Sequence, residues 1–218
     1  MNAERFYECW QQEPLPLVAI LRGIAPPQAE EAAEILISCG FRWLEVPLNS
    51  PSALESIALM RKHAGDKARI GAGTVLTTEQ VDEVADHGGQ LIVSPNCNPA
   101  VIRRSRERGL ISLPGVTTPT EAFNAIEAGA SGLKLFPAEQ MSPAVVKAFR
   151  AVLPAKIACL PVGGITPDAQ TLRTWLQAGA NGFGLGGALY QAGMSFKTLH
   201  VRASAFHLAW LTARGLEK

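Results

Sequence analysis

Short apolar runs alternate with longer polar or amphipathic segments along most of the chain. Each run has the length of one buried strand, and each intervening segment is long enough for a helix. The runs recur at intervals of roughly 20 to 26 residues, about the length of one βα unit in an eightfold barrel. Eight of them can be read from the sequence: LVAIL (17–21), WLEV (43–46), ARIGA (68–72), QLIVS (90–94), LISL (110–113), GLKLF (132–136), IACLPV (157–162) and GFGLG (182–186). The pattern predicts a parallel α/β protein.

Cap residues and glycines divide the chain between these runs. A capping residue followed by proline, the usual start of a helix, occurs at Ser50, Asn98, Thr118, Ser142 and Thr166, and Thr77 has the same role without proline. Glycine follows most of the predicted helices, as in SCGF, DHGG and EAGA. The eightfold repeat favours a closed (β/α)8 TIM barrel over an open doubly wound sheet, and no GxGxxG follows the first run.

Two further helices are predicted outside the repeat, one at about 3–12 and one at about 195–213. No linker, low-complexity stretch or charge run marks a second domain, so residues 1–218 are interpreted as one (β/α)8 barrel domain with an additional N-terminal helix.

Composition narrows the classes of function. A net charge of +1 argues against a nucleic-acid footprint or a polybasic membrane patch, so neither partner is predicted. No apolar run approaches the roughly 20 residues needed to span a bilayer. The polar, amphipathic N-terminal segment is unlike a signal peptide, which predicts a cytoplasmic protein. The four cysteines and four histidines lack metal-ligand spacing, so no metal and no cofactor is expected.

Charged residues interrupt two of the apolar runs. In GLKLF, outward-facing Leu133 and Leu135 turn Lys134 into the barrel, and the same alternation turns Glu45 inward in WLEV. Arg22 falls just past the end of the first run. All three charges are predicted to meet at the carboxyl ends of the strands, where barrel enzymes carry their active sites. A snorkelling side chain or a structural ion pair is the alternative for Lys134 alone, but three converging charges favour function.

A desolvated lysine with a second cation nearby loses its proton more easily than a free lysine. The neutral amine can then attack a ketone and form a Schiff base, which makes Lys134 the candidate nucleophile. Glu45 is the one carboxylate that the alternation directs to the same place, and it is the candidate general acid and base.

Glycine-rich turns follow the last two runs, in PVGGIT (161–166) and GLGGA (184–188). The loops after strands 7 and 8 form the usual phosphate site of such barrels, because backbone N–H groups can approach an anion closely there. Tight turns without a ligand are the alternative. A third turn, GAGT (71–74), places the Thr74 hydroxyl where it could bind a carboxylate.

Eight motifs in order, ILRGI, LEVPLNSP, IGAGTVL, VSPN, PGVTTPTEA, LKLFPAE, PVGGIT and GLGGALY, resemble those of the 2-keto-3-deoxy-6-phosphogluconate (KDPG) aldolase family over about residues 15–195. The resemblance implies a metal-free class I aldolase, a cytosolic homotrimer, that cleaves a phosphorylated keto-deoxy sugar acid to pyruvate and glyceraldehyde 3-phosphate. It assigns the imine to Lys134 and proton transfer to Glu45. It further implies substrate contacts by Arg22, Thr74, Pro95 and Phe136, with phosphate held by Gly163, Gly164, Gly186 and Gly187.

Two positions depart from the usual gluconate pattern. Asn49 stands where those enzymes commonly have arginine, which removes a guanidinium, and Val162 stands where they have threonine, which removes a hydroxyl near C4 of the substrate. Both departures resemble the branch that cleaves the C4 epimer, 2-dehydro-3-deoxy-6-phosphogalactonate (KDPGal), to pyruvate and D-glyceraldehyde 3-phosphate. Gly187 replaces a common serine, which leaves only backbone donors for the phosphate at that position.

Three alternatives stay open. The first is a gluconate-specific aldolase of the same family with unusual pocket residues. The other two are a metal-free phosphosugar isomerase or epimerase and a non-catalytic phosphosugar-binding barrel, neither of which explains why Lys134 and Glu45 converge.

Overall fold

Parallel strands form the centre of the molecule. The structure, a computed structural model, describes residues 1–216. Its strands make a six-stranded sheet in the order β5-β4-β3-β2-β1-β9 and a three-stranded sheet in the order β6-β7-β8. Their bounds are β1 Leu17–Ile20, β2 Trp43–Pro47, β3 Arg69–Gly73, β4 Leu91–Val93, β5 Ile111–Leu113, β6 Gly115–Val116, β7 Gly132–Leu135, β8 Ala158–Pro161 and β9 Phe183–Leu185. Each predicted apolar run overlaps one of these strands, and every pairing between the strands is parallel.

Backbone contacts connect the two sheets at both junctions. A parallel bridge joins Val162 to Gly184 between β8 and β9. At the other junction, the Ser131 N–H donates to the Ser112 carbonyl at 2.8 Å, and the Lys134 N–H donates to the Pro114 carbonyl at 2.9 Å. Pro114 separates β5 from β6, and because proline has no N–H to donate, the ladder is interrupted there.

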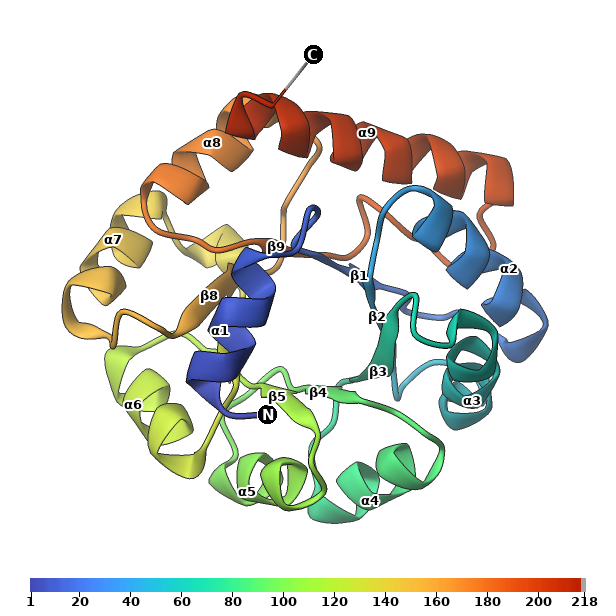
Figure 1. Ribbon diagram of the computed structural model, residues 1–218, viewed down its shortest axis with the longest axis horizontal. Coiled ribbons are helices and arrows are strands. Elements are labelled where there is room, and N and C mark those ends of the chain that lie inside the picture. Colours follow the sequence, from blue (N-terminus) through green and yellow to red (C-terminus); the bar gives the residue numbers. More distant parts are fainter. Residues whose placement is uncertain (217–218) are drawn as a thin grey trace.

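Most of the helices surround the strands in a ring, and the first helix lies outside it (Figure 1). Their bounds are α1 Ala3–Gln11, α2 Pro26–Ser38, α3 Ala53–Ala64, α4 Thr78–Asp86, α5 Pro99–Glu107, α6 Pro119–Ala128, the 3-10 helix η1 Ala138–Gln140, α7 Pro143–Val152, α8 Ala169–Gln177 and α9 Phe196–Arg214. The first and last α-helices agree with their predicted ranges within one residue at each end. None of the described helices is long and apolar enough to cross a membrane.

Most predicted helix starts are confirmed, and two are wrong. Thr77 and Thr118 form capping boxes at α4 and α6, and Asn98 caps α5. Helix α3 begins after Ser52 rather than after Ser50, because the Ser50 hydroxyl accepts a hydrogen bond from the Gly23 N–H at 2.8 Å. Helix α8 begins after Asp168 rather than after Thr166, since the Asp168 carboxylate accepts from the Thr171 N–H at 2.7 Å.

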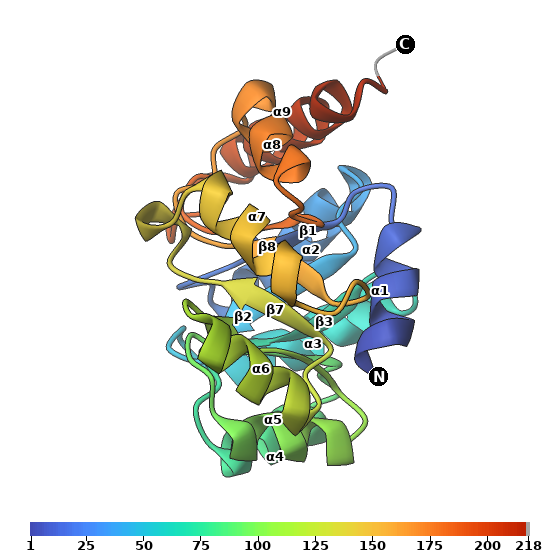
Figure 2. The ribbon, with the colours of Figure 1, turned by 90° about the vertical axis from the view of Figure 1, so that its left-hand side faces the viewer.

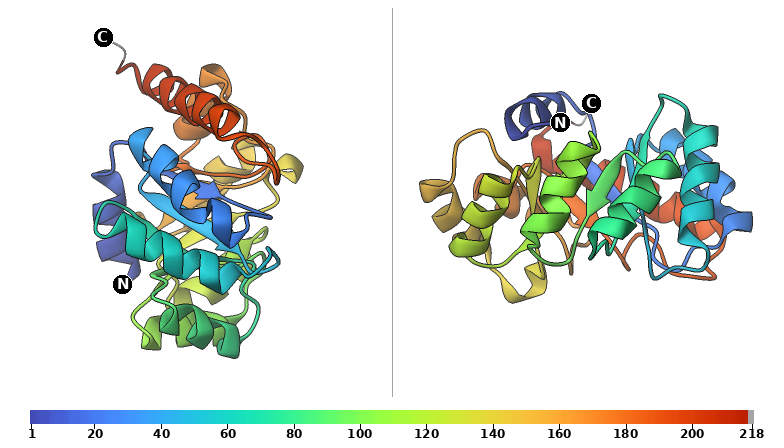
Figure 3. Two further views of the ribbon diagram at one scale, coloured as in Figure 1. Left: turned by 90° about the vertical axis from the view of Figure 1, so that its right-hand side faces the viewer. Right: turned by 90° about the horizontal axis from the view of Figure 1, so that it is seen from below.

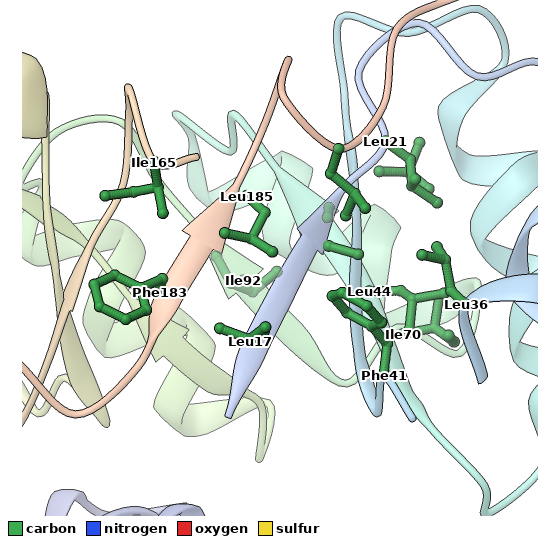
Figure 4. Close-up of a cluster of buried hydrophobic side chains, with 14 of the residues drawn as sticks. Leu17, Leu21, Leu36, Phe41, Leu44, Ile70, Ile92, Ile165, Phe183 and Leu185 are labelled. Carbon is green, nitrogen blue, oxygen red and sulfur yellow. The ribbon is translucent and has the colours of Figure 1, made fainter. Parts of the chain in front are cut away.

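Alternate strand residues pack into two separate clusters, as the period of two predicts. An outer cluster lies between the strands and the helices and contains Leu44, Val46, Leu133 and Leu135. Figure 4 shows part of it, with Leu17 and Leu185 on adjacent strands and Leu36 on a covering helix. An inner cluster, enclosed by the strands, contains Val18, Trp43, Leu91, Val93, Ile111, Leu113, Ala158 and Leu160 together with Phe6 and Trp10 of α1.

Helix α1 packs against the amino ends of the strands. Figures 2 and 3 show it at one end of the strands, outside the ring of helices. Its buried residues Phe6 and Trp10 meet Trp43, the first residue of β2, with ring centroids 5.0 to 5.7 Å apart. The Trp10 indole N–H also donates to the Asn181 carbonyl at 2.9 Å. This apolar contact covers the amino ends, which leaves the carboxyl ends of the strands as the accessible face.

Candidate functional site

Lys134 lies in the middle of a buried strand. Its neighbours Leu133 and Leu135 pack outward, so its side chain points to the inner side, where only 6% of the residue is exposed. Burial lowers the pKa of Lys134, because desolvation disfavours the ammonium form. The nearby Arg22 charge lowers this pKa further, whereas the Glu45 carboxylate opposes both effects. The result is an amine that releases its proton more readily than a lysine in water.

Glu45 occupies the equivalent inner position on β2. It is 2% exposed, and burial raises its pKa, with Lys134 and Arg22 acting in the opposite direction. Its Oε2 atom has no hydrogen-bond partner among residues 1–216. Its Oε1 atom lies against Gly73 at the end of β3, where a β-carbon would come within 2.4 Å of it. A buried carboxyl oxygen without a protein partner is free to receive or deliver a proton.

Two adjoining cavities open from these side chains. A small inner cavity of about 10 Å³, about the size of one water molecule, is lined by both Glu45 and Lys134. A larger cavity of about 700 Å³ lies at the carboxyl ends of the strands. Ile20, Lys134 and Val162 line both. Lys134 and Glu45 therefore line one small cavity, which shares three lining residues with a cavity large enough for a sugar acid.

The large cavity brings together most of the predicted site residues. Its lining includes Arg22, Lys134, Phe136, Val162, Gly163, Gly164, Gly186 and Gly187. The Phe136 ring lies 4.6 Å from the Lys134 Nζ, a cation–π distance, and forms one wall beside the amine. Thr74 and Pro95 lie just after β3 and β4 but line neither cavity. Thr74 has a positive φ of 57°, which is uncommon for a residue with a branched side chain.

The loop after β2 holds Arg22 in place. Arg22 Nη1 donates to Asn49 Oδ1 at 2.7 Å, and the next residues in each loop, Gly23 and Ser50, are also hydrogen-bonded. From the sequence, Asn49 was interpreted only as the replacement of an arginine, with loss of its guanidinium. The structure shows that its side chain also anchors the remaining one, a contact between two loops that spacing alone does not reveal.

Two side chains that the sequence analysis did not single out lie beside the glycine turns. Gly163 and Gly164 both have positive φ, at 109° and 64°, and the side chain of Glu139 lies beside them. From the other turn, the Gly187 carbonyl accepts a hydrogen bond from Arg202 Nη1 of α9 at 3.1 Å. The available signal was the LKLFPAE motif, which ends on Glu139, but the motif alone does not give its orientation.

Within residues 1–216, no group of three or more histidine, cysteine, aspartate or glutamate side chains is arranged to hold a metal ion. The four cysteines are unpaired thiols, and burial raises the pKa of Cys159.

Fold and site together define a parallel α/β protein that carries a buried lysine and a buried carboxylate on the inner side of its strands, next to a cavity at their carboxyl ends. A family model described as KDPG and KHG aldolase matches residues 11–199, and the chain belongs to this family. It is 49% identical over 204 residues to 2-dehydro-3-deoxy-6-phosphogalactonate aldolase of Escherichia coli (strain K12), covering 94% of this chain and 98% of the relative.

More distant members are less similar. The 2-dehydro-3-deoxy-phosphogluconate aldolase of Treponema pallidum (strain Nichols) is 35% identical over 156 residues, with 70% of this chain and 74% of the relative covered.

Among solved structures, one described as native KDPGal superposes with a TM-score of 0.90 at 49% identity and covers 93% of this chain and 97% of that one. The resemblance read from the motifs is thus confirmed at the level of the family.

Proposed function

We propose that this protein is a class I aldolase that cleaves 2-dehydro-3-deoxy-6-phosphogalactonate to pyruvate and D-glyceraldehyde 3-phosphate. One observation carries the proposal: buried Lys134 and Glu45 share a water-sized cavity that adjoins a large cavity at the carboxyl ends of the strands. Membership of the family and the 49% identity to a galactonate-branch aldolase support the reaction and the choice of branch.

In this proposal the neutral Lys134 amine attacks the C2 ketone, and loss of water with uptake of one proton gives a protonated imine. Glu45 then removes the proton of the C4 hydroxyl, and the C3–C4 electron pair moves into the imine as the bond breaks. The aldehyde product leaves, and the proton held by Glu45 returns to C3 of the enamine. Water hydrolyses the resulting protonated imine, which releases pyruvate and one proton and restores the neutral amine.

The substrate's orientation is taken from the contacts that the family resemblance implies, since Thr74 and Pro95 line neither cavity. We place its carboxylate near Arg22 and Thr74, its pyruvate portion against Phe136 and Pro95, and its C4 hydroxyl near Val162. The phosphate then lies on the backbone of Gly163, Gly164, Gly186 and Gly187, where glycine allows close approach. A valine near C4 provides no hydrogen bond to that hydroxyl, so it does not enforce the gluconate configuration.

The architecture completes the proposal. We infer that β5 and β6 are two halves of one strand and that the strands close into a (β/α)8 barrel formed by the whole chain as one domain. The bridge between β8 and β9 supports this closure. The homotrimer remains a prediction from the family resemblance, and the cytoplasmic location remains a prediction from the N-terminal sequence.

Borohydride reduction in the presence of pyruvate, followed by peptide mass mapping, tests the proposal. We expect a reduced pyruvate adduct on Lys134 and loss of both adduct and turnover in Lys134→Met. Lys147→Met, which changes an exposed lysine of α7, is the matched control and should keep both. Turnover that survives Lys134→Met would favour an isomerase or epimerase, and phosphosugar binding without any turnover would favour a binding protein.

Retro-aldol kcat/KM on the two C4 epimers decides the branch. A preference for the galactonate epimer is expected, and a clear gluconate preference would assign the chain to the gluconate-specific enzymes instead.

A further inference from the structure

The position of Glu139 is fixed by a contact between two loops. The Ala138 N–H at the start of η1 donates to the Val162 carbonyl at 2.9 Å. This bond sets the residue after Ala138 beside the residue after Val162. A β-carbon on Gly163 would lie 2.0 Å from Glu139 Oε2, and one on Gly164 would lie 2.7 Å from Glu139 Cγ. The Glu139 side chain therefore fills the space directly over the first glycine turn.

This placement puts a negative charge at the end of the cavity that is proposed to receive a phosphate. Glu139 is the one carboxylate among the described residues that line the large cavity. The two cations that line the cavity, Arg22 and Lys134, lie at the end where the imine is proposed to form, and both lower the pKa of Glu45. Arg202 contacts the carbonyl of Gly187 rather than lining the cavity, and Gly187 itself offers no hydroxyl.

We propose that Glu139 sets the phosphate affinity of this site: its carboxylate competes with the substrate's phosphate for the space over Gly163 and Gly164 and repels it. The inference rests on the proposed function, because it concerns the phosphate end of the same substrate. Two unit charges about 4 Å apart in water repel each other enough to change a binding constant about fivefold. Because Glu139 is exposed, this solvent-screened value applies rather than the larger one for a buried pair.

Such a residue weakens binding of substrate and phosphorylated product alike. It therefore raises KM and speeds release of glyceraldehyde 3-phosphate without acting on the bond that breaks. It also protects the enzyme against inhibition by inorganic phosphate. Glu139 is in this sense an affinity-setting residue rather than a catalytic one.

Inorganic phosphate is the probe that tests the proposal. Its dissociation constant is measured by titration calorimetry and by competitive inhibition of turnover, at low and high ionic strength. We expect Glu139→Gln and Glu139→Ala to bind phosphate about three- to tenfold more tightly than the wild type, with the difference shrinking at high salt. Glu127→Gln, which removes the same charge from an exposed position on α6, should leave phosphate affinity within about twofold.

Substrate discrimination gives a second readout. The ratio of kcat/KM for the phosphorylated and the unphosphorylated keto-deoxy acid should rise in Glu139→Gln, while the pyruvate adduct on Lys134 forms as in the wild type. Unchanged or weaker phosphate binding in Glu139→Gln would overturn the proposal, and so would an equal gain in Glu127→Gln. The adduct separates the two failures: if it forms normally while the phosphate results are negative, the inference fails and the aldolase assignment stands.

Discussion

Gly73 controls the position of the Glu45 carboxylate, and Gly73→Ala is the sharpest test of this dependence. A β-carbon at this position would lie 2.4 Å from Glu45 Oε1 and 2.9 Å from Glu45 Cδ, whereas ordinary contact begins at 3.4 Å. The carboxylate must therefore retreat by about 1.0 Å, the difference between 3.4 and 2.4 Å. A misplacement of about 1 Å in a reacting group costs on the order of 10²-fold in rate, which is the expected loss of kcat. Overpacking should also destabilise the fold by about 1–3 kcal/mol, or roughly 2–12 °C in Tm.

The assay combines steady-state turnover with borohydride trapping at Lys134. We expect Gly73→Ala to lose kcat and to retain the pyruvate adduct, because the alanine displaces Glu45 and not the lysine. Glu45→Gln keeps the shape of the side chain and removes the proton acceptor, with an expected loss of about 10²–10⁴-fold. If Gly73 acts only through Glu45, adding Gly73→Ala to Glu45→Gln should cost less than about threefold more, since both changes remove the same function.

Two results would refute this reasoning. A stable Gly73→Ala variant with wild-type kcat would show that the Glu45 carboxylate does not need its present position. Fully multiplicative losses in the double variant would show that Gly73 affects turnover by a route independent of Glu45.

Three further predictions concern the pH dependence of turnover, the contact between Asn49 and Arg22, and the packing of helix α1. Imine formation needs the neutral amine, so the rate should rise with pH through the pKa of Lys134. Arg22 lowers that pKa, so Arg22→Gln should move the acidic limb of the pH–rate profile to higher pH. Glu45 raises it, so Glu45→Gln should move the same limb to lower pH. Asn49→Ala frees the Arg22 guanidinium and should raise KM about three- to tenfold with little change in kcat, whereas a KM unchanged within error contradicts an anchoring role. Phe6→Ala should lower the free energy of unfolding by about 3–5 kcal/mol, measured by thermal or urea unfolding, because Phe6 is fully buried. It should leave kcat within about twofold, because Phe6 packs at the opposite end of the strands from the site. A large loss of kcat would show that this end of the strands affects the reaction.

The sequence predicted the strands and their two faces well, for a simple physical reason. A strand of four or five residues between two apolar layers leaves few alternatives, and its period of two assigns Leu133 and Leu135 to one face and Lys134 to the other. The glycines that end helices were equally readable, because a left-handed conformation such as that of Gly129 strongly favours glycine.

Contacts between loops were not predicted. Ser50 and Thr166 each precede a proline and resemble helix caps, yet α3 and α8 begin two residues beyond each proline. Ser50 instead bonds Gly23 across the site, and Asn49 bonds Arg22 in the same way. A serine hydroxyl can either cap the next helix or form a long-range hydrogen bond, and the neighbouring sequence does not indicate which of the two forms. The position of Glu139 could not be predicted for the same reason, because it depends on a hydrogen bond from the Ala138 N–H to the carbonyl of Val162, which is distant in the sequence.

The pairing of Lys134 with Glu45 explains why burial of two ionisable groups serves the chemistry. Burial pushes each toward its neutral form, whereas their mutual attraction favours the ion pair. The neutral pair and the ion pair hold the same number of protons, so a proton can pass between them without a change of net charge. Arg22 lowers the pKa of both groups, which favours a carboxylate beside a neutral amine, the combination that imine formation requires. The apparent pKa values then belong to the coupled pair, so a change at Arg22 should move both of them in the same direction and shift the acidic limb of the profile.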